Sequence, residues 1–310
     1  MSSTAADMGN ASARKRQRTG ARWKEKAVEL VLLGAASTSI LIVALIFLFN
    51  FKEAAPFIVD PGLGELVGSR WVPVSFQEQA FGLLPLITGS LLVTIVATLI
   101  AVPFGVCGAV YLSEVATAAE RAFFKPFIEL LAGIPSVVIG FFGLVVVAPR
   151  IKELFHLNSG MVALTGAVIL ALMAVPTIVT ISEDAIRSVP EAYKQASLAL
   201  GASRVQTIWK VTVPAALSGI IAAVMLGIGR VVGETMAVMM VTGNAALVTL
   251  SPFESVRTMT ATIAGEMGEV AFGSTHYRAL FWVGIVLLLF TFALNIIAQR
   301  VLARYRMYRS

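Results

Sequence analysis

The sequence has few charged residues for its length. Asp, Glu, Lys and Arg make up only 14% of the 310 residues, whereas 57% of the residues are hydrophobic. Soluble proteins typically carry about 25% charged residues, and a soluble core could not bury this much apolar surface. The scarcity of charge excludes an ordinary soluble protein and indicates that lipid surrounds much of the chain.

Residues that bind metals or act as nucleophiles are also scarce. Cys107 is the only cysteine, which excludes an intrachain disulfide, and we interpret it as a small buried hydrophobic residue. The two histidines, His156 and His276, lie far apart, with no metal-binding or nucleophilic cluster around either. We expect both to be solvated loop residues, and we predict no metal site, no catalytic residue and no membrane enzyme.

A nucleotide-binding loop is missing as well. The pattern G-x-x-x-x-G-K-[ST], which cradles phosphates in many ATPases, does not occur, and no Gly-Lys pair exists anywhere in the sequence. We therefore predict that this chain binds no cofactor. Any ATP that drives its function would be hydrolysed by another chain.

Long apolar runs are what the sequence has in abundance. A hydrocarbon core of ~30 Å needs about 20 helical residues to cross it. The first run is too long for the core of a signal peptide, so we interpret it as a retained helix. The pattern predicts an all-α polytopic membrane protein with about six transmembrane helices, at residues 27–50, 83–112, 123–149, 161–182, 214–245 and 279–302.

The distribution of Lys and Arg sets the expected orientation. These residues gather before the first span, after the second and fourth spans, and at the C-terminal end. The positive-inside rule then places both termini in the cytoplasm. Attraction to anionic lipid headgroups explains the basic start, so we expect no nucleic-acid binding. We predict a disordered basic cytoplasmic tail (1–26), a first transmembrane helix (27–50), an external segment (51–82), a membrane core (83–302) and a cytoplasmic tail (303–310).

One long cytoplasmic loop, residues 183–213, has the pattern of two short helices joined by a glycine. Pro190 and Glu191 suit the first turn of a helix, and Gly201 suits the position that ends it. A second amphipathic turn leads into the fifth span at Pro214. The physics leaves two interpretations open, an ordinary surface loop or a docking surface for a cytoplasmic partner.

The spacing within this loop resembles the coupling loop of ABC importer permeases. In that loop an E-A-A triplet precedes a glycine by four positions, and a hydrophobic-Pro pair closes the motif. The corresponding residues here are Gln195, Ala196 and Ser197, then Gly201, then Pro214. Gln stands where Glu is usual and Ser where the second Ala is usual, while the Ala and Gly packing positions are kept.

Two ionisable residues lie inside the fifth predicted span. Arg230 and Glu234 would each cost about 2.5–3.5 kcal/mol at a bilayer centre, so we expect them to face the bundle interior. Their i,i+4 spacing puts them on one face of a helix. They could form an internal ion pair. Alternatively, Arg230 could meet an anion in a transport pathway while Glu234 holds the Arg230 side chain.

Two further segments could meet an oxyanion. Gly133 and Pro135 break the third span next to Ser136, and a broken helix exposes N–H groups. The alternative is a kinked packing helix. Thr258 begins a series of alternate hydroxyls, which could bind an oxyanion or cap a short helix that folds back into the bundle.

Several separate segments together resemble the PstC family of phosphate-specific permeases. They are residues 81–85, 129–138, 182–185, 229–236 (which includes Thr235) and 257–264. The resemblance implies type I ABC importer permease architecture in the bacterial cytoplasmic (inner) membrane. It also implies a PstA-like sister permease, a PstB-like ATPase dimer that uses the ATP, and a PstS-like binding protein that delivers inorganic phosphate.

The function that the resemblance implies is import of phosphate by alternating access. The expected substrate pathway contains Arg230, Glu234, Ser136, Thr235 and Thr258. Two alternatives remain open at this point. One is a permease for another oxyanion, such as molybdate, sulfate or phosphonate, and the other is a membrane scaffold or sensor component without a transport path.

Overall fold

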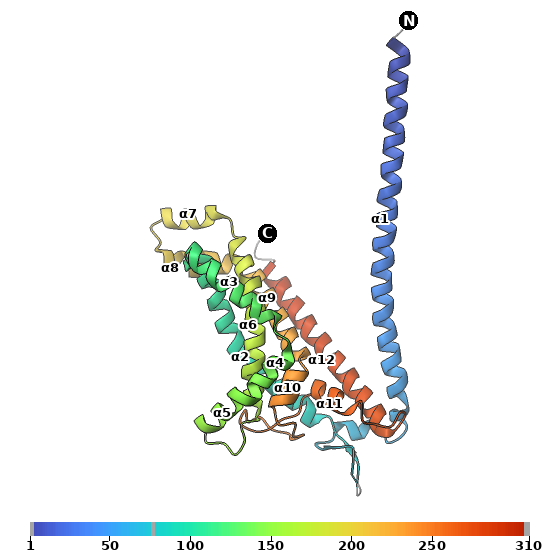
Figure 1. The fold of residues 1–310 in the computed structure, drawn as a ribbon, viewed down its shortest axis with the longest axis vertical. Helices are drawn as coiled ribbons and strands as arrows, with labels where there is room; N and C mark the ends of the chain where they lie inside the picture. Colours follow the sequence, from blue (N-terminus) through green and yellow to red (C-terminus); the bar gives the residue numbers. More distant parts are fainter. Residues whose placement is uncertain (1–2, 76–77, 307–310) are drawn as a thin grey trace. The chain divides into compact units, whose positions relative to one another are not determined.

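The computed structural model describes the backbone of residues 3–75 and 78–306, and the side chains of 25–75, 78–300 and 303 (Figure 1). The chain forms two compact units, one ending at Glu53 and the other beginning at Ala54. The second unit is a bundle of helices, and it contains every candidate site residue.

The first unit consists of the helix α1, Ser3–Ala54, without its last residue. Its side chains from Glu25 to Phe49 are exposed, as expected of a helix that contacts lipid or another subunit. The structure differs from the predicted disordered tail 1–26, because the helix begins at Ser3. The stretch contains no proline and several good helix formers, which favours continuation of the helix. Residues 1–2 lie outside the described residues.

Among the described residues, five helical stretches are long and apolar enough to cross a membrane, and one bent pair of helices makes a sixth candidate. This confirms the predicted number of spans. The first stretch, Glu25–Ile58, lies mostly in α1, and α6 (Ala163–Arg187) and α12 (Thr275–Arg306) supply two others. α2 (Leu84–Val110) continues into the π-helical turn η3 (Tyr111–Val115). The rest of the predicted tail 303–310, beyond Arg306, lies outside the described residues.

The bent pair is the predicted third span. α3 (Ala118–Gly133) ends where Gly133 and Pro135 were expected to break the helix, and α4 (Ser136–Phe142) follows. A π-helical turn, η4 (Gly143–Val147), then leads into α5 (Ala148–Leu154). The two halves meet at 98°, so this span is sharply bent rather than straight.

The fifth span departs from the prediction. α8 (Arg204–Thr207) and the π-helical turn η5 (Ile208–Thr212) run into α9, Val213–Gly233. α9 stops at Gly233, two extended or irregular residues follow, and α10 occupies Met236–Val241. The apolar helix of this span therefore ends at Gly233 rather than near residue 245, because the chain leaves the helical conformation at Glu234 (φ −72°, ψ 133°).

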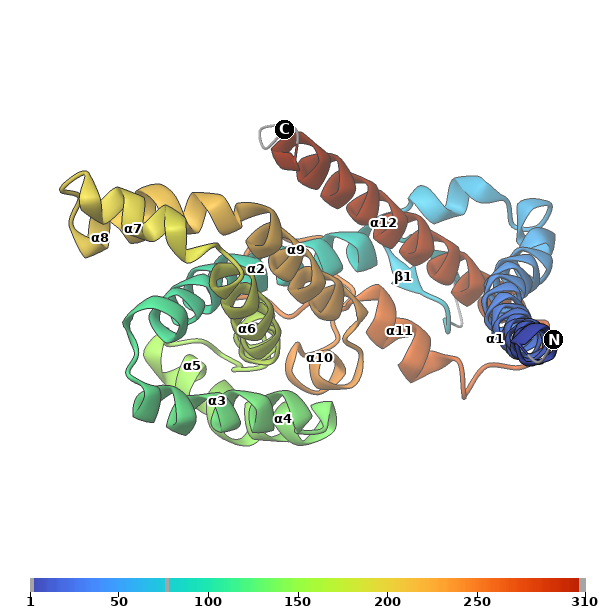
Figure 2. The same ribbon diagram turned by 90° about the horizontal axis from the view of Figure 1, so that it is seen from above.

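The centre of the bundle is α6, which packs against both α2 and α9 (Figure 2). A Cβ on Gly105 of α2 or on Gly227 of α9 would lie 2.6 or 2.7 Å from the side chain of Ile178. These glycines therefore let both helices approach α6 at the same residue. Cys107 on α2 is exposed, so its predicted burial is wrong.

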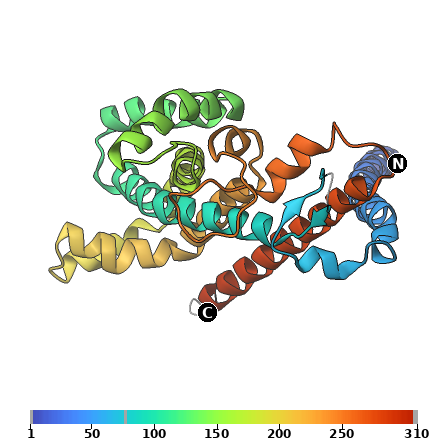
Figure 3. The same cartoon turned by 90° about the horizontal axis from the view of Figure 1, so that it is seen from below.

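Residues 55–75 and 78–82 form a small cap on the bundle. Two 3-10 turns, η1 (Ala55–Ile58) and η2 (Leu63–Val67), precede the antiparallel strands β1 (Trp71–Val72) and β2 (Ala80–Phe81). Figure 3 shows this strand pair beside α11 (Met259–Glu266) and α12. Trp71 and Phe81 pack with Leu280 of α12 in a buried apolar cluster.

Candidate functional site

The break between α9 and α10 places two predicted pathway residues in different settings. Arg230 lies in the last turn of α9 and has no hydrogen bond or ion pair within the described part of the chain. Glu234 lies beyond the helix end, where its Oε1 accepts a hydrogen bond from the backbone N–H of Ala237, at 3.2 Å. The expected shared helix face is therefore wrong, and the internal ion pair considered for these two residues is not formed.

Glu234 lines a small cavity at this break (about 10 Å³). That volume is about the space of one water molecule. Hydroxyl groups from two other segments line it as well, two from α2 and two from the start of α11. The polar residues of its wall are Ser90, Thr94, Glu234, Thr258 and Thr260.

Hydrogen bonds hold the three segments of the cavity together. The backbone N–H of Met259 donates to Ser90 Oγ at 2.9 Å, which ties α11 to α2. Thr260 Oγ1 donates to the carbonyl oxygen of Glu234 at 2.9 Å, which ties α11 to the helix break. Because Ser90 acts as an acceptor here, its own O–H stays available to donate to a ligand.

Thr258 has the capping role that the sequence offered as one of two alternatives. It is the N-cap of α11, with its Oγ1 accepting a hydrogen bond from the Ala261 N–H, and α11 folds back against α2 and α12. It also lines the cavity beside Glu234, with Thr260 Oγ1 3.2 Å from its own Oγ1.

The other two predicted pathway residues lie near the break without lining the cavity. Thr235 directly precedes α10, and its Oγ1 donates to the carbonyl oxygen of Gly233 at 3.3 Å. Ser136 begins α4, and α4 packs on α10 so closely that a Cβ on Gly140 would lie 2.8 Å from Ala237 Cα. The structure thus brings Glu234 and Thr258 together and leaves Ser136 on a neighbouring helix.

Ser90 and Thr94 are cavity residues that the sequence analysis missed, whereas Thr260 is one of the alternate hydroxyls that it noted after Thr258. Ser90 and Thr94 stand four apart in an apolar helix, so they lie on one face of it. That spacing was the available signal. Hydroxyls in apolar helices commonly bond to their own backbone, so the signal is a weak one.

The predicted helix–glycine–helix loop is confirmed. α7 covers Glu191–Ala199 and α8 begins after it, and the two project from one end of the bundle (Figure 1). Gly201 has φ +85°, and its N–H donates to Leu198 O at 2.9 Å, which closes the end of α7. Gln195, Ala196 and Ser197 lie on α7, and Pro214 lies in the first turn of α9.

A groove of about 520 Å³ runs between the two short helices. Ser197 Oγ lies 2.9 Å from Thr207 Oγ1 and links them across the turn. The wall of the groove is mostly apolar or uncharged and includes Ala196, Ser197 and the highly exposed Leu200. Such a surface is suited to receive a partner.

A buried carboxylate lies at the same end of the bundle. Glu183 on α6 is 1% exposed and forms ion pairs with three cations. Lys125 Nζ lies 3.2 Å away, Arg187 Nη1 3.4 Å and Arg121 Nε 3.9 Å. The cluster joins the start of α3 to the end of α6.

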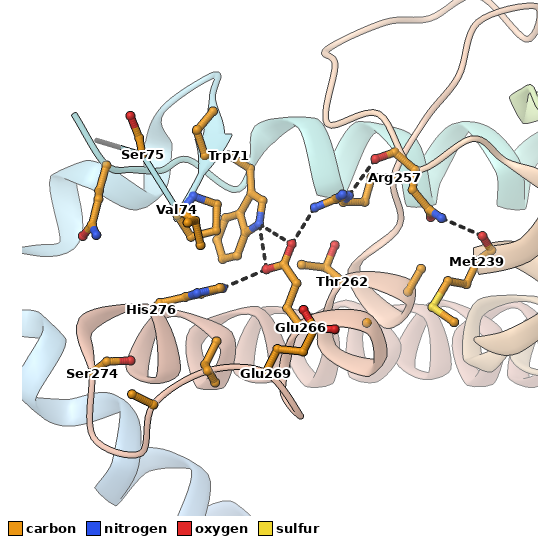
Figure 4. A pocket seen from close by; sticks show the side chains of 18 residues that line it. Trp71, Val74, Ser75, Met239, Arg257, Thr262, Glu266, Glu269, Ser274 and His276 are labelled. Atoms are coloured by element: carbon orange, nitrogen blue, oxygen red, sulfur yellow. Dashed lines mark hydrogen bonds and ion pairs between the residues drawn. The ribbon is translucent and has the colours of Figure 1, made fainter. Parts of the chain in front are cut away.

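The opposite end of the bundle has a larger cavity of about 770 Å³, shown in Figure 4. Glu266 is its central residue, accepting hydrogen bonds from Trp71 Nε1 and Arg257 Nη1. His276 Nε2 lies 2.9 Å from Glu266 Oε2, and its side chain is only 12% exposed. The prediction of a solvated loop residue is therefore wrong for His276, whereas His156 is exposed.

Comparison with solved structures identifies the class of fold. A chain of a bacterial alginate ABC transporter, in complex with an alginate pentasaccharide-bound periplasmic protein, matches with a TM-score of 0.61 at 17% identity. The match covers 88% of this chain and 94% of that one. A chain of the inward-facing MetNI methionine ABC transporter matches with a TM-score of 0.54 at 19% identity, covering 71% and 96%. The fold is thus that of the type I ABC importer permeases.

Sequence comparison then gives the family. The model of the binding-protein-dependent transport system inner membrane component matches residues 101–307, and the chain belongs to this family. Among its relatives is the probable ABC transporter permease protein YqgH of Bacillus subtilis, 39% identical over 86% of this chain and 84% of that one. The phosphate transport system permease protein PstC of Mesorhizobium japonicum is 35% identical over 89% and 86%. PstC 1 of Mycobacterium tuberculosis is 36% identical over 72% and 73%.

Proposed function

We propose that this chain is a transmembrane permease subunit of an ATP-driven importer for inorganic phosphate. The PstC relatives support the choice of substrate. The observation that carries the proposal is the α9–α10 break, where an arginine without a described partner lies one turn before a cavity lined by hydroxyls and a carboxylate.

These groups have the chemistry that an oxyanion pathway needs. Arg230 offsets part of the charge of phosphate, and the Ser90 and Thr94 hydroxyls donate hydrogen bonds to its oxygens. The cavity holds about one water molecule, so phosphate enters only when α2, α10 and α11 separate. That requirement fits alternating access, in which the site is closed in one state and open in another.

The remaining partners follow from the same proposal. A PstB-like ATPase dimer docks at the coupling loop, through Gln195, Ala196, Ser197, Gly201 and the region up to Pro214, and supplies the ATP hydrolysis. A PstA-like sister permease completes the pathway, and a PstS-like binding protein delivers phosphate from outside. The complex lies in the bacterial cytoplasmic (inner) membrane with both termini of this chain in the cytoplasm, as the distribution of Lys and Arg indicates.

The test is uptake of radiolabelled phosphate into proteoliposomes that contain the complete complex and binding protein. Arg230→Ala should lower uptake roughly tenfold or more while assembly and ATP hydrolysis persist, because a hydrogen bond to a charged group contributes about 1.5–3 kcal/mol. Arg150→Ala is the matched control, since Arg150 is exposed on α5 and has no ion pair among the described residues.

The outcomes separate the alternatives. Unchanged phosphate uptake in Arg230→Ala would show that Arg230 does not belong to the substrate pathway. If the assembled, ATP-hydrolysing wild-type complex imports sulfate, molybdate or phosphonate instead of phosphate, the substrate is that oxyanion. A transport-dead but assembled Arg230→Ala complex would argue against a scaffold or sensor without a transport path.

A further inference from the structure

The ion pair between Lys194 and Glu114 connects the coupling loop to a membrane helix. We infer that this pair transmits movement of α7 to α2, and so to the cavity at the α9–α10 break. Lys194 and Glu114 are positioning residues in this scheme, because neither lines the cavity. The inference rests on the proposed function in one respect, that an ATPase docks on α7.

The geometry of the pair is that of a strong and protected contact. Lys194 Nζ lies 2.7 Å from Glu114 Oε1, and the two side chains are 16% and 10% exposed. Lys194 also lies 3.6 Å from Glu191, but the Glu191 side chain is 67% exposed. Water screens an exposed pair far more than a buried one, so Glu114 is the partner that holds Lys194.

This pair is the bond through which α7 reaches beyond its own loop. Within the described ranges, the other side-chain bonds of α7 stay inside the loop, namely Lys194 to Glu191 and Ser197 to Thr207. Glu114 belongs to η3, which continues α2 without interruption. A displacement of α7 by a docked ATPase therefore acts directly on the end of α2.

The turn η3 is anchored so that it can pass on such a displacement. Arg121 of α3 donates to the carbonyl oxygens of Leu112 and Ser113 in η3, at 2.8 and 3.2 Å. Arg121 also lies 3.9 Å from the buried Glu183 of α6. π-helical turns often occur at functional positions. Here the turn collects contacts from α3, α6 and α7.

The far end of α2 lies at the candidate site. Ser90 and Thr94 line the cavity, and Ser90 accepts a hydrogen bond from Met259 at the start of α11. About 20 residues separate Thr94 from Glu114, a helical distance of roughly 30 Å. A helix that is held at Glu114 and moves as one body changes the spacing between Ser90, Thr94 and Glu234.

The experiment compares wild type, Lys194→Glu, Glu114→Lys and the double exchange in the complete complex in proteoliposomes. Two quantities are measured, phosphate imported per ATP hydrolysed and movement of a spin label on Cys107. Cys107 is exposed on α2 and is the only cysteine of this chain, so cysteine-free partner subunits make the label specific. Glu191→Gln is the matched control on the same helix.

Each single exchange should leave assembly and ATP hydrolysis in place and lower import per ATP roughly tenfold, the effect of losing one charge-assisted contact. The ATP-dependent movement of the spin label on Cys107 should disappear in both single variants. The double exchange should restore both readouts, and Glu191→Gln should leave them unchanged. Restoration separates a loss of coupling from a simple loss of folding.

Single exchanges with wild-type import per ATP and a wild-type label response would overturn the inference. So would a double exchange that restores neither readout. The label response needs ATP but no particular oxyanion. A complex that moves at Cys107 yet imports no phosphate would refute the proposed substrate and leave the role of Lys194 and Glu114 intact.

Discussion

Lys125 Nζ on α3 lies 3.2 Å from Oε2 of Glu183 on α6, although 58 residues separate them in the sequence. Glu183 is 1% exposed, and its other oxygen faces Arg121 and Arg187. The buried carboxylate therefore offsets part of the repulsion among the three positive charges around it. This arrangement fixes the bent span at α3, which has few other contacts with the bundle.

Replacing this carboxylate should destabilise the packing of α3 on α6. Glu183→Gln removes the charge with little change of shape and leaves three cations around a neutral amide. Breaking a buried ion pair costs about 3–5 kcal/mol, and partial exposure of these cations lowers that to about 2 kcal/mol. Thermal unfolding in detergent measures the effect. Glu129→Gln on α3 is the control, because Glu129 is exposed and unpaired among the described residues.

The hydroxyl of Thr94 should contribute to substrate binding. It lines the cavity and has no hydrogen-bond partner within the described ranges, so it is available to an oxyanion. Thr94→Val keeps the shape and removes the donor, which should raise the half-saturating phosphate concentration about fivefold. Thr88→Val serves as the control, since the Thr88 hydroxyl already bonds to Leu84 O. Equal half-saturation in the two variants would remove Thr94 from the site.

The two helix breaks show what the sequence could and could not predict. Gly133 and Pro135 disfavour helix locally, so the break of the third span could be predicted from residue type alone. Only Gly233 precedes Glu234 and Thr235, without a proline, and the apolar run continues past them. There the chain leaves the helix where Thr260, 26 residues further on, donates to the Glu234 carbonyl. A contact so distant in sequence leaves no local pattern.

The same distinction applies to the coupling loop and the ion pairs. Pro190 and Gly201 define the loop by their own backbone preferences, and the structure has both helices where the sequence predicted them. The partners of Glu183 and Glu114 come from other helices and depend on how those helices pack. The sequence shows which residues are basic, but it does not show which of the basic residues at that end of the bundle pair with Glu183 and Glu114.

Glu266 should hold the strand pair of the cap against α12. It joins Trp71 of β1 to Arg257 and His276 (Figure 4). Glu266→Gln weakens three contacts to a carboxylate, and loss of about 1.4 kcal/mol would speed amide exchange over residues 71–81 roughly tenfold.

Hydrogen-exchange mass spectrometry of the detergent-solubilised protein measures this rate. Glu269→Gln is the matched control, because Glu269 lines the same cavity without a side-chain bond among the described residues. Identical exchange in both variants would show that Glu266 does not hold the cap.

The turn at Gly201 should control docking of the proposed ATPase subunit through its backbone conformation. Its φ is +85°, and a Cβ there would meet no atom within 4 Å, so a substitution is opposed by conformation alone. The left-handed backbone conformation costs alanine about 1–2 kcal/mol, whereas asparagine adopts it more readily. Gly201→Ala should weaken the affinity for the ATPase subunit about tenfold, and Gly201→Asn only a few-fold.

Titration of purified ATPase onto the permease complex in nanodiscs measures both affinities. Gly268→Ala is the control, because its Cβ site is open and its φ is not positive. Equal affinities for the Ala and Asn variants would mean that the left-handed turn does not govern docking.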